Sequence, residues 1–129
     1  MSPKRTRIWG AILSLASSAA LAVAALSPPP WAQVPARDHA HSNPFAGRAD
    51  AVSAGALLYH SHCLQCHKAE GRGDGNKKPP LRSERIQAAT DGDLEWFLRQ
   101  GDLRHGMPSW SSLPEAQRWQ IVAYLRSIQ

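Results

Sequence analysis

The pattern of apolar and polar positions divides the chain into three parts. Residues 8–26 are apolar or small and carry no charge. Residues 28–48 show neither a helical nor a strand period and are rich in Pro, Ala, Ser, Asn and Gly. From Ala49 onward apolar residues recur at helical spacing, and no alternating strand pattern is present. The sequence therefore predicts an all-α domain over residues 49–129, preceded by a flexible linker over residues 28–48.

Three amphipathic helices are predicted in this domain, each with apolar residues at a spacing of three or four. Gly55 weakens the first helix unless another element must approach it closely. Gly101 is a suitable end for the second helix. The three apolar faces comprise Val52, Gly55, Ala56 and Tyr59; Leu94, Phe97 and Leu98 after the N-cap Thr90; and Trp119, Ile121, Val122, Leu125 and Ile128 after Pro114.

The N-terminal residues 1–27 have the order of a secretory signal. Lys4, Arg5 and Arg7 precede the uncharged stretch, and Ser27 with three prolines follows it. The stretch at residues 8–26 is also just long enough to span a bilayer, so a retained membrane anchor is the alternative to a cleaved signal peptide. Either interpretation places the domain in the periplasm or on the outer face of the cytoplasmic membrane.

The two cysteines of the chain occur in a single motif, Cys63-x-x-Cys66-His67. This spacing is typical of covalent haem attachment. On a helix, residues i and i+3 lie on one face, so both thiols can reach one edge of a porphyrin. The imidazole of His67 then follows as a ligand to the iron. We therefore expect Cys63, Cys66 and His67 to hold one c-type haem.

Other functions of a Cys-x-x-Cys pair are less consistent with the sequence. A thioredoxin-like redox pair requires a βαβ pattern, a zinc finger requires a second ligand pair, and a disulfide closing so short a loop stabilises little. His60 and His62 are expected to be solvated residues on a helix face. His39 and His41, in the predicted linker, are also expected to be solvated.

The second axial ligand of the iron is expected from the segment Gly106-Met107-Pro108. A thioether favours Fe(II), so ligation by Met107 raises the reduction potential. Gly106 permits a close backbone approach, and Pro108 stiffens the loop. His105 is the alternative ligand and would give a lower potential. The predicted metal ligands are thus His67 and Met107.

These features together resemble a class I mono-haem cytochrome c domain over residues 49–129. The resemblance implies three to five short helices wrapped around one covalent haem, with the N-terminal and C-terminal helices crossing. It also implies that the carbonyl of Pro79, or of its neighbour Pro80, accepts a hydrogen bond from His67. Such a contact orients the ring and raises its basicity. The resemblance rests on Gly55-x-x-x-Tyr59, Cys63-x-x-Cys66-His67, Gly71-x-Gly73, Pro79-x-Leu81, Gly106-Met107-Pro108 and the run from Trp119 to Leu125.

Electron transfer is the function that this combination predicts. We expect an electron carrier, or the cytochrome subunit of a larger oxidoreductase, rather than an enzyme. Its expected partners are redox proteins such as a periplasmic dehydrogenase and a respiratory oxidase or reductase. A haem enzyme or gas sensor with an open iron position is the alternative. Nucleic acid is an unsuitable partner, because three of the five net positive charges lie in residues 1–27, which leaves +2.

Overall fold

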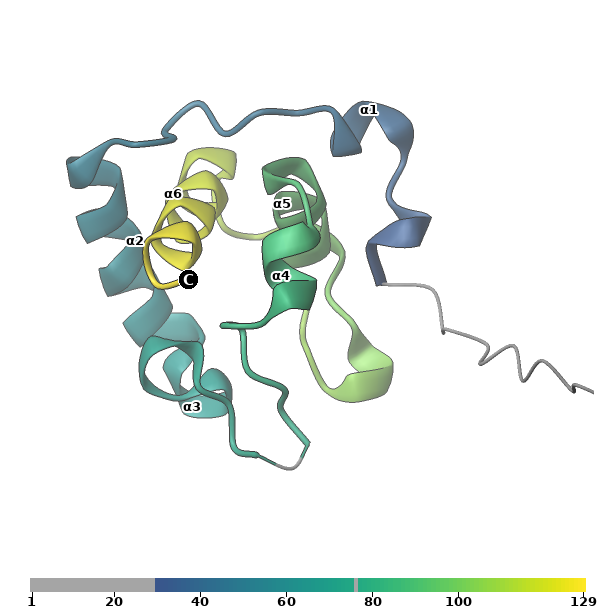
Figure 1. Cartoon of the computed structure of the whole chain (residues 1–129), viewed down its shortest axis with the longest axis vertical. Helices are drawn as coiled ribbons and strands as arrows, with labels where there is room; N and C mark the ends of the chain where they lie inside the picture. Colours follow the sequence, from purple (N-terminus) through teal and green to yellow (C-terminus); the bar gives the residue numbers. More distant parts are fainter. Residues whose placement is uncertain (1–29, 76) are drawn as a thin grey trace, which may run out of the picture.

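The computed structural model describes residues 30–75 and 77–129, and this part of the chain is helical without β-strands (Figure 1). The all-α prediction is confirmed, and residues 49–129 contain five α-helices, as the class I cytochrome c fold implies. The predicted signal or anchor lies outside the described residues. In chain order the elements are η1 (Pro30–Gln33), α1 (Ala36–His39), α2 (Ala49–His62), α3 (Leu64–His67), η2 (Ala69–Gly71), α4 (Glu84–Ala88), α5 (Asp91–Gln100), η3 (Leu103–His105) and α6 (Glu115–Ser127).

Helices α2 and α6 cross at Gly55. A β-carbon on Gly55 would lie 2.0 Å from the carbonyl oxygen of Gln120 and 2.9 Å from Cβ of Tyr124. Four residues later the ring of Tyr59 packs on the ring of Tyr124, with centroids 5.1 Å apart. The predicted crossing of the N-terminal and C-terminal helices is therefore confirmed. The buried face of α2 differs slightly from the prediction, because Ala51 accompanies Gly55 and Tyr59 while Val52 and Ala56 are half-buried.

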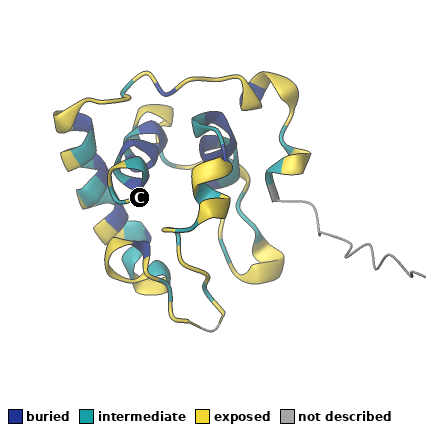
Figure 2. Ribbon diagram, in the orientation of Figure 1, coloured by how far each residue is buried: buried dark blue, intermediate teal, exposed yellow. Residues whose placement is uncertain are grey.

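The core lies between α6 and the helices on either side of it (Figure 2). Helix α6 contributes most of the buried side chains, and α5 adds Leu94 and Leu98, whereas Phe97 is half-buried. The start of α5 is fixed by a capping box, in which Thr90 Oγ1 accepts from the Asp93 amide and Asp93 accepts from the Thr90 amide. Most of the predicted α6 face is buried, whereas Ile128 is half-buried and Ala123 is buried without having been predicted. The buried residues of α6 are Arg118, Trp119, Ile121, Val122, Ala123 and Leu125.

Residues 30–48 form a strap that packs on α5 and α6, which differs from the flexible linker predicted for residues 28–48. The carbonyl of Asp38 approaches Gly92 so closely that a β-carbon there would lie 1.9 Å from the oxygen. His39 Nδ1 lies 2.8 Å from the buried Asp93 carboxylate, and Asn43 Nδ2 donates to the Trp119 carbonyl at 3.0 Å. Hydrophobic periodicity does not detect these contacts, because single polar groups make them.

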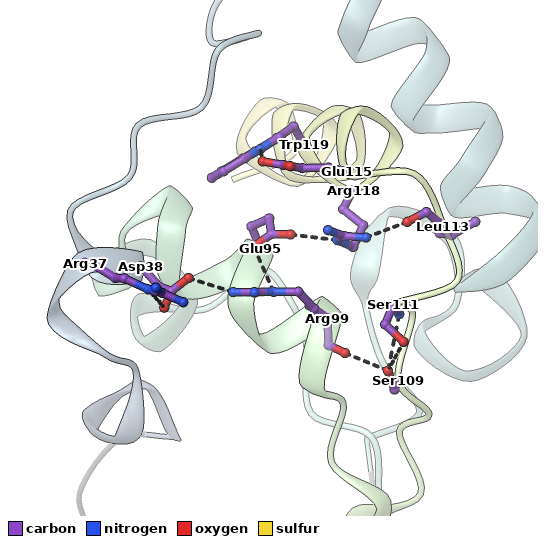
Figure 3. A network of polar contacts seen from close by, with 10 residues as sticks. All are labelled: Arg37, Asp38, Glu95, Arg99, Ser109, Ser111, Leu113, Glu115, Arg118 and Trp119. Atoms are coloured by element: carbon purple, nitrogen blue, oxygen red, sulfur yellow. Dashed lines mark hydrogen bonds and ion pairs between the residues drawn. The ribbon is translucent and has the colours of Figure 1, made fainter.

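A chain of charged side chains joins the strap to α5 and α6 (Figure 3). Asp38 accepts from Arg99 at 2.6 Å, and Glu95 accepts from Arg118 at 2.6 Å. The two pairs are linked because Arg99 Nε also lies 3.6 Å from Glu95. Arg118 donates further to the carbonyl of Leu113, in the loop that leads into α6. This network fixes the strap and the loop before α6 to the same helix.

None of the helices in residues 30–75 and 77–129 has the length and apolarity needed to cross a bilayer.

Candidate haem site

The predicted haem-attachment residues lie where α2 ends and α3 begins. Cys63 is both the C-cap of α2 and the N-cap of α3. Its carbonyl accepts a hydrogen bond from the amide of His67 at 2.9 Å. Both thiols are free, with Cys63 buried and Cys66 exposed. Burial, with a smaller contribution from nearby Cys66, raises the pKa of the Cys63 thiol to about 11. Cys63 is therefore a neutral thiol at physiological pH rather than a thiolate.

The imidazole of His67 has the properties of an unsatisfied metal ligand. The residue is half-buried, and its Nδ1 atom is shielded from solvent without a hydrogen-bond partner among the described residues. Burial, followed by the charge of Lys78, lowers the pKa of this ring and favours its neutral form. The neutral imidazole is the form that binds a metal. A buried polar atom without a partner is rare, so this nitrogen is available for one further contact.

The loop after α3 folds back on the backbone of His67. The amide of Gly73 donates to the His67 carbonyl at 2.8 Å. Gly73 also admits the following turn, since a β-carbon there would lie 2.2 Å from the Lys78 carbonyl oxygen and 3.1 Å from that of Pro79. Pro79 therefore lies next to Gly73, which is hydrogen-bonded to the backbone of His67. The Pro79 carbonyl and the His67 ring are not hydrogen-bonded to each other in this structure. The predicted hydrogen bond to Pro79, or to Pro80 as the alternative, therefore stays a prediction.

The loop that carries Met107 is anchored on both sides. Asp102 and Met107 exchange two backbone hydrogen bonds of 2.8 and 2.9 Å in an isolated antiparallel bridge. Gly106 has the left-handed conformation, with φ of 78°, that closes the turn between them. On the far side, Ser109 Oγ donates to the Arg99 carbonyl at 2.6 Å. Met107 itself is half-buried and packs against the core.

His105, the alternative ligand, is directed elsewhere. Its side chain is 80% exposed, and its Nδ1 lies 2.6 Å from the Asp102 carboxylate. This hydrogen bond is the main reason that the pKa of Asp102 falls below its usual value. The same turn therefore holds His105 at the surface, next to the Asp102 carboxylate, and Met107 against the core.

Lys78 connects the two loops. Its ammonium group donates to the carbonyl of His105 at 3.0 Å, and it is also close enough to His67 to lower the pKa of the ring. Figure 1 shows α3, the loop after it and the η3 turn at the same end of the molecule. The structure thus brings together the segments of Cys63, His67 and Met107.

Sequence reasoning missed several residues of this region. Hydrophobic periodicity gave no signal for Lys78 or Asp102, which act through backbone and charge contacts. His62 was expected to be solvated, but it is half-buried, and its ring contacts that of Trp110 in a tilted arrangement with centroids 5.1 Å apart. Trp110 is in turn fixed by a backbone hydrogen bond to Leu98 of 2.8 Å. His60 is exposed, as expected.

The residues present fit a c-type haem. Two thiols on adjacent turns, an imidazole with a buried unpartnered nitrogen and a thioether on an anchored loop form the donor set of such a group. Cys63 belongs to the buried core cluster, and the half-buried side chains of Leu64, Leu81 and Met107 pack against that cluster. The fold and the site together define a class I c-type cytochrome domain.

Comparison with known families agrees with this class. Residues 50–125 match the family described as cytochrome c oxidase, cbb3-type, subunit III. The chain belongs to this cytochrome c family, whose domains carry covalently bound haem c and perform haem-based electron transfer. No significant match to a curated protein or to a solved structure was found.

Proposed function

We propose that this protein is a single-haem electron carrier in which His67 and Met107 are the axial ligands of the iron. The observation that carries the proposal is the orientation of the η3 turn, which holds Met107 against the core and His105 at the surface. The haem would supply one-electron chemistry between Fe(III) and Fe(II). With His67 and Met107 both bound to the iron, no position would remain for a substrate.

Cys63 and Cys66 are the proposed points of covalent attachment. The burial of Cys63 argues against a redox function of the pair, because the thiolate is the reactive form. With its pKa raised to about 11, this thiol stays protonated at neutral pH. The chain contains two cysteines and one Cys-x-x-Cys-His motif, which supports a single haem.

The chain's own contribution to electron transfer would be to hold the two proposed ligands in place. The backbone of His67 is held by two hydrogen bonds: its amide donates to the Cys63 carbonyl, and its carbonyl accepts from the Gly73 amide. Met107 is held by the bridge to Asp102. Ligands that move little between redox states keep the reorganisation accompanying electron transfer small, which suits rapid exchange with a partner.

The proposed partners are redox proteins outside the cytoplasm. Cytochrome c domains are typically extracytoplasmic, and the description of the matched family, a subunit of a cbb3-type cytochrome c oxidase, supports a respiratory partner. A periplasmic dehydrogenase as donor and an oxidase or reductase as acceptor are consistent with that setting. Residues 1–27 would direct export as a signal peptide or an anchor, and residues 49–129 would form the cytochrome domain. Small, weak contacts near the thioether edge would allow rapid turnover.

The proposal is tested with protein produced alongside a haem-maturation system. After extraction with acid and acetone, the mass of wild type should exceed that of the bare chain by one haem. Reduced wild type should remain low-spin and bind carbon monoxide poorly. A mass equal to the bare polypeptide would contradict covalent attachment. Rapid carbon monoxide binding by wild type would instead favour an open iron position, and with it the haem enzyme or gas sensor.

A further inference from the structure

The backbone becomes strained at the residue directly after His67. Lys68 has φ of 60° and ψ of 175°, a combination that is essentially restricted to glycine. In residues 30–75 and 77–129, Lys68 and Glu70 are the only non-glycine residues with positive φ. Strained backbone of this kind persists only where surrounding contacts hold it. The turn after His67 therefore depends on groups that stabilise an unfavourable conformation of Lys68.

The hydroxyl of Tyr59 provides such a contact. It donates to the carbonyl oxygen of Lys68 at 2.7 Å. The same carbonyl accepts the amide of Gly71 at a longer 3.2 Å, and the amide of Lys68 donates to Leu64. The hydroxyl of Tyr59, on α2, thus makes the shorter hydrogen bond to this carbonyl. That contact fixes the peptide group between Lys68 and Ala69.

Tyr59 is itself held rigidly. The residue is 2% exposed, and its ring packs on Tyr124 next to the close crossing of α2 and α6 at Gly55. Burial is the main cause that raises the pKa of Tyr59 to about 12. The hydroxyl therefore remains a hydrogen-bond donor throughout the physiological pH range.

We infer that Tyr59 is a positioning residue for His67, which it orients by holding Lys68 in its strained conformation. The inference rests on the proposed role of His67 as an iron ligand. The aromatic ring alone would fill the space in the core, and only the hydroxyl reaches Lys68. The helix crossing is in this way linked to the ligand through Tyr59 and one peptide group.

The test compares Tyr59→Phe with Tyr124→Phe in the haem-loaded protein. Tyr124 is the matched control, because the described residues offer its hydroxyl no hydrogen-bond partner. The readout is the pH at which the ferric low-spin spectrum is lost on acidification, where protonation competes with iron for His67. Loss of the hydrogen bond should weaken ligation by up to about tenfold, which raises a one-proton midpoint by about one pH unit. Tyr124→Phe should leave the midpoint near that of wild type.

A second substitution separates orientation of His67 from general stability. Glycine adopts the conformation of residue 68 without strain, so Lys68→Gly should return the midpoint of Tyr59→Phe toward the wild-type value. If Tyr59→Phe does not yield haem protein, recovery of haem protein in the double variant supports the inference equally.

Three results would overturn it. One is an equal midpoint for the Tyr59→Phe and Tyr124→Phe proteins. Another is the absence of any rescue by Lys68→Gly. A wild-type protein that carries haem without a low-spin ferric spectrum would remove the proposed function, and this inference with it.

Discussion

Gly55 of α2 lies against the backbone of α6, where an added β-carbon would be 2.0 Å from the carbonyl oxygen of Gln120. A rigid carbonyl cannot move aside as a flexible side chain could. The two helices that form the core therefore approach as closely as they do because residue 55 has no side chain. The nearby Tyr59 and Tyr124 rings depend on the same approach.

Gly55→Ala should therefore destabilise the domain, although alanine is the better helix former. We expect a loss of about 2–3 kcal/mol in the free energy of unfolding, measured by denaturant titration of the haem protein. Leu57→Ala on the same helix is the control, because Leu57 is 72% exposed and its truncation should change stability by less than about 0.5 kcal/mol. Equal stability of Gly55→Ala and wild type would show that the helices do not cross in this way.

Lys78→Gln should weaken the connection between the loop after His67 and the loop that carries Met107. The lost hydrogen bond to His105 is near the surface, so the effect on Met107 ligation should be about 0.5 kcal/mol. Lys77→Gln is the matched control, since Lys77 is the neighbouring exposed lysine and none of the described residues accepts from its ammonium group. Denaturant titration of the band from the thioether–iron bond measures the difference. Identical titrations of Lys78→Gln and Lys77→Gln would show that the Lys78 hydrogen bond does not support Met107 ligation.

The same substitution has a predictable effect on pH dependence. Burial and the charge of Lys78 lower the pKa of His67 in the folded protein. The unfolded chain therefore binds more protons, so the folded state loses stability as the pH falls below the ordinary histidine value of about 6.5. Removal of the Lys78 charge should raise the pKa of His67 and move the acid loss of low-spin haem to higher pH. A shift to lower pH in Lys78→Gln would contradict this assignment.

The strap should contribute to stability through Asn43. Its amide is buried and donates to the carbonyl of Trp119. Asn43→Ala should lower the free energy of unfolding by about 1–2 kcal/mol and speed proteolysis between residues 34 and 48. Ser42→Ala, at the exposed neighbouring position, should change neither. Cleavage of wild type in this segment as fast as in Asn43→Ala would instead agree with the flexible linker expected from the sequence.

The sequence was sufficient to predict the parts of the fold that depend on local patterns. Apolar spacing identified α2, α5 and α6, and the Thr90 cap was recognisable because Ncap chemistry is local. The docking of residues 30–48 was not predictable, because Asp38, His39 and Asn43 bind groups more than fifty positions away. A Pro-rich and polar segment gives no periodic signal of such contacts.

For the candidate site, the residue types could be predicted from the sequence, but their arrangement in space could not. Cys63, Cys66, His67 and Met107 were selected because of their chemistry and spacing. Sequence alone weighed His105 against Met107 by ligand preference and by the flanking Gly106 and Pro108. The contact between His105 and the Asp102 carboxylate becomes visible only once the turn is folded. The strain at Lys68 was similarly invisible, since lysine is not a residue type associated with positive φ.

The proposed electron carrier depends on Met107 as the second ligand of the iron. The most direct test is the near-infrared spectrum of the ferric haem protein, in which a thioether bond to iron gives a weak charge-transfer band. Wild type and His105→Asn should both show this band. Met107→His should lose it, stay low-spin and have a lower reduction potential, because imidazole supports Fe(III) better than a thioether does. Absence of the band from wild type, with a spectrum changed by His105→Asn and unchanged by Met107→Ala, would contradict ligation by Met107.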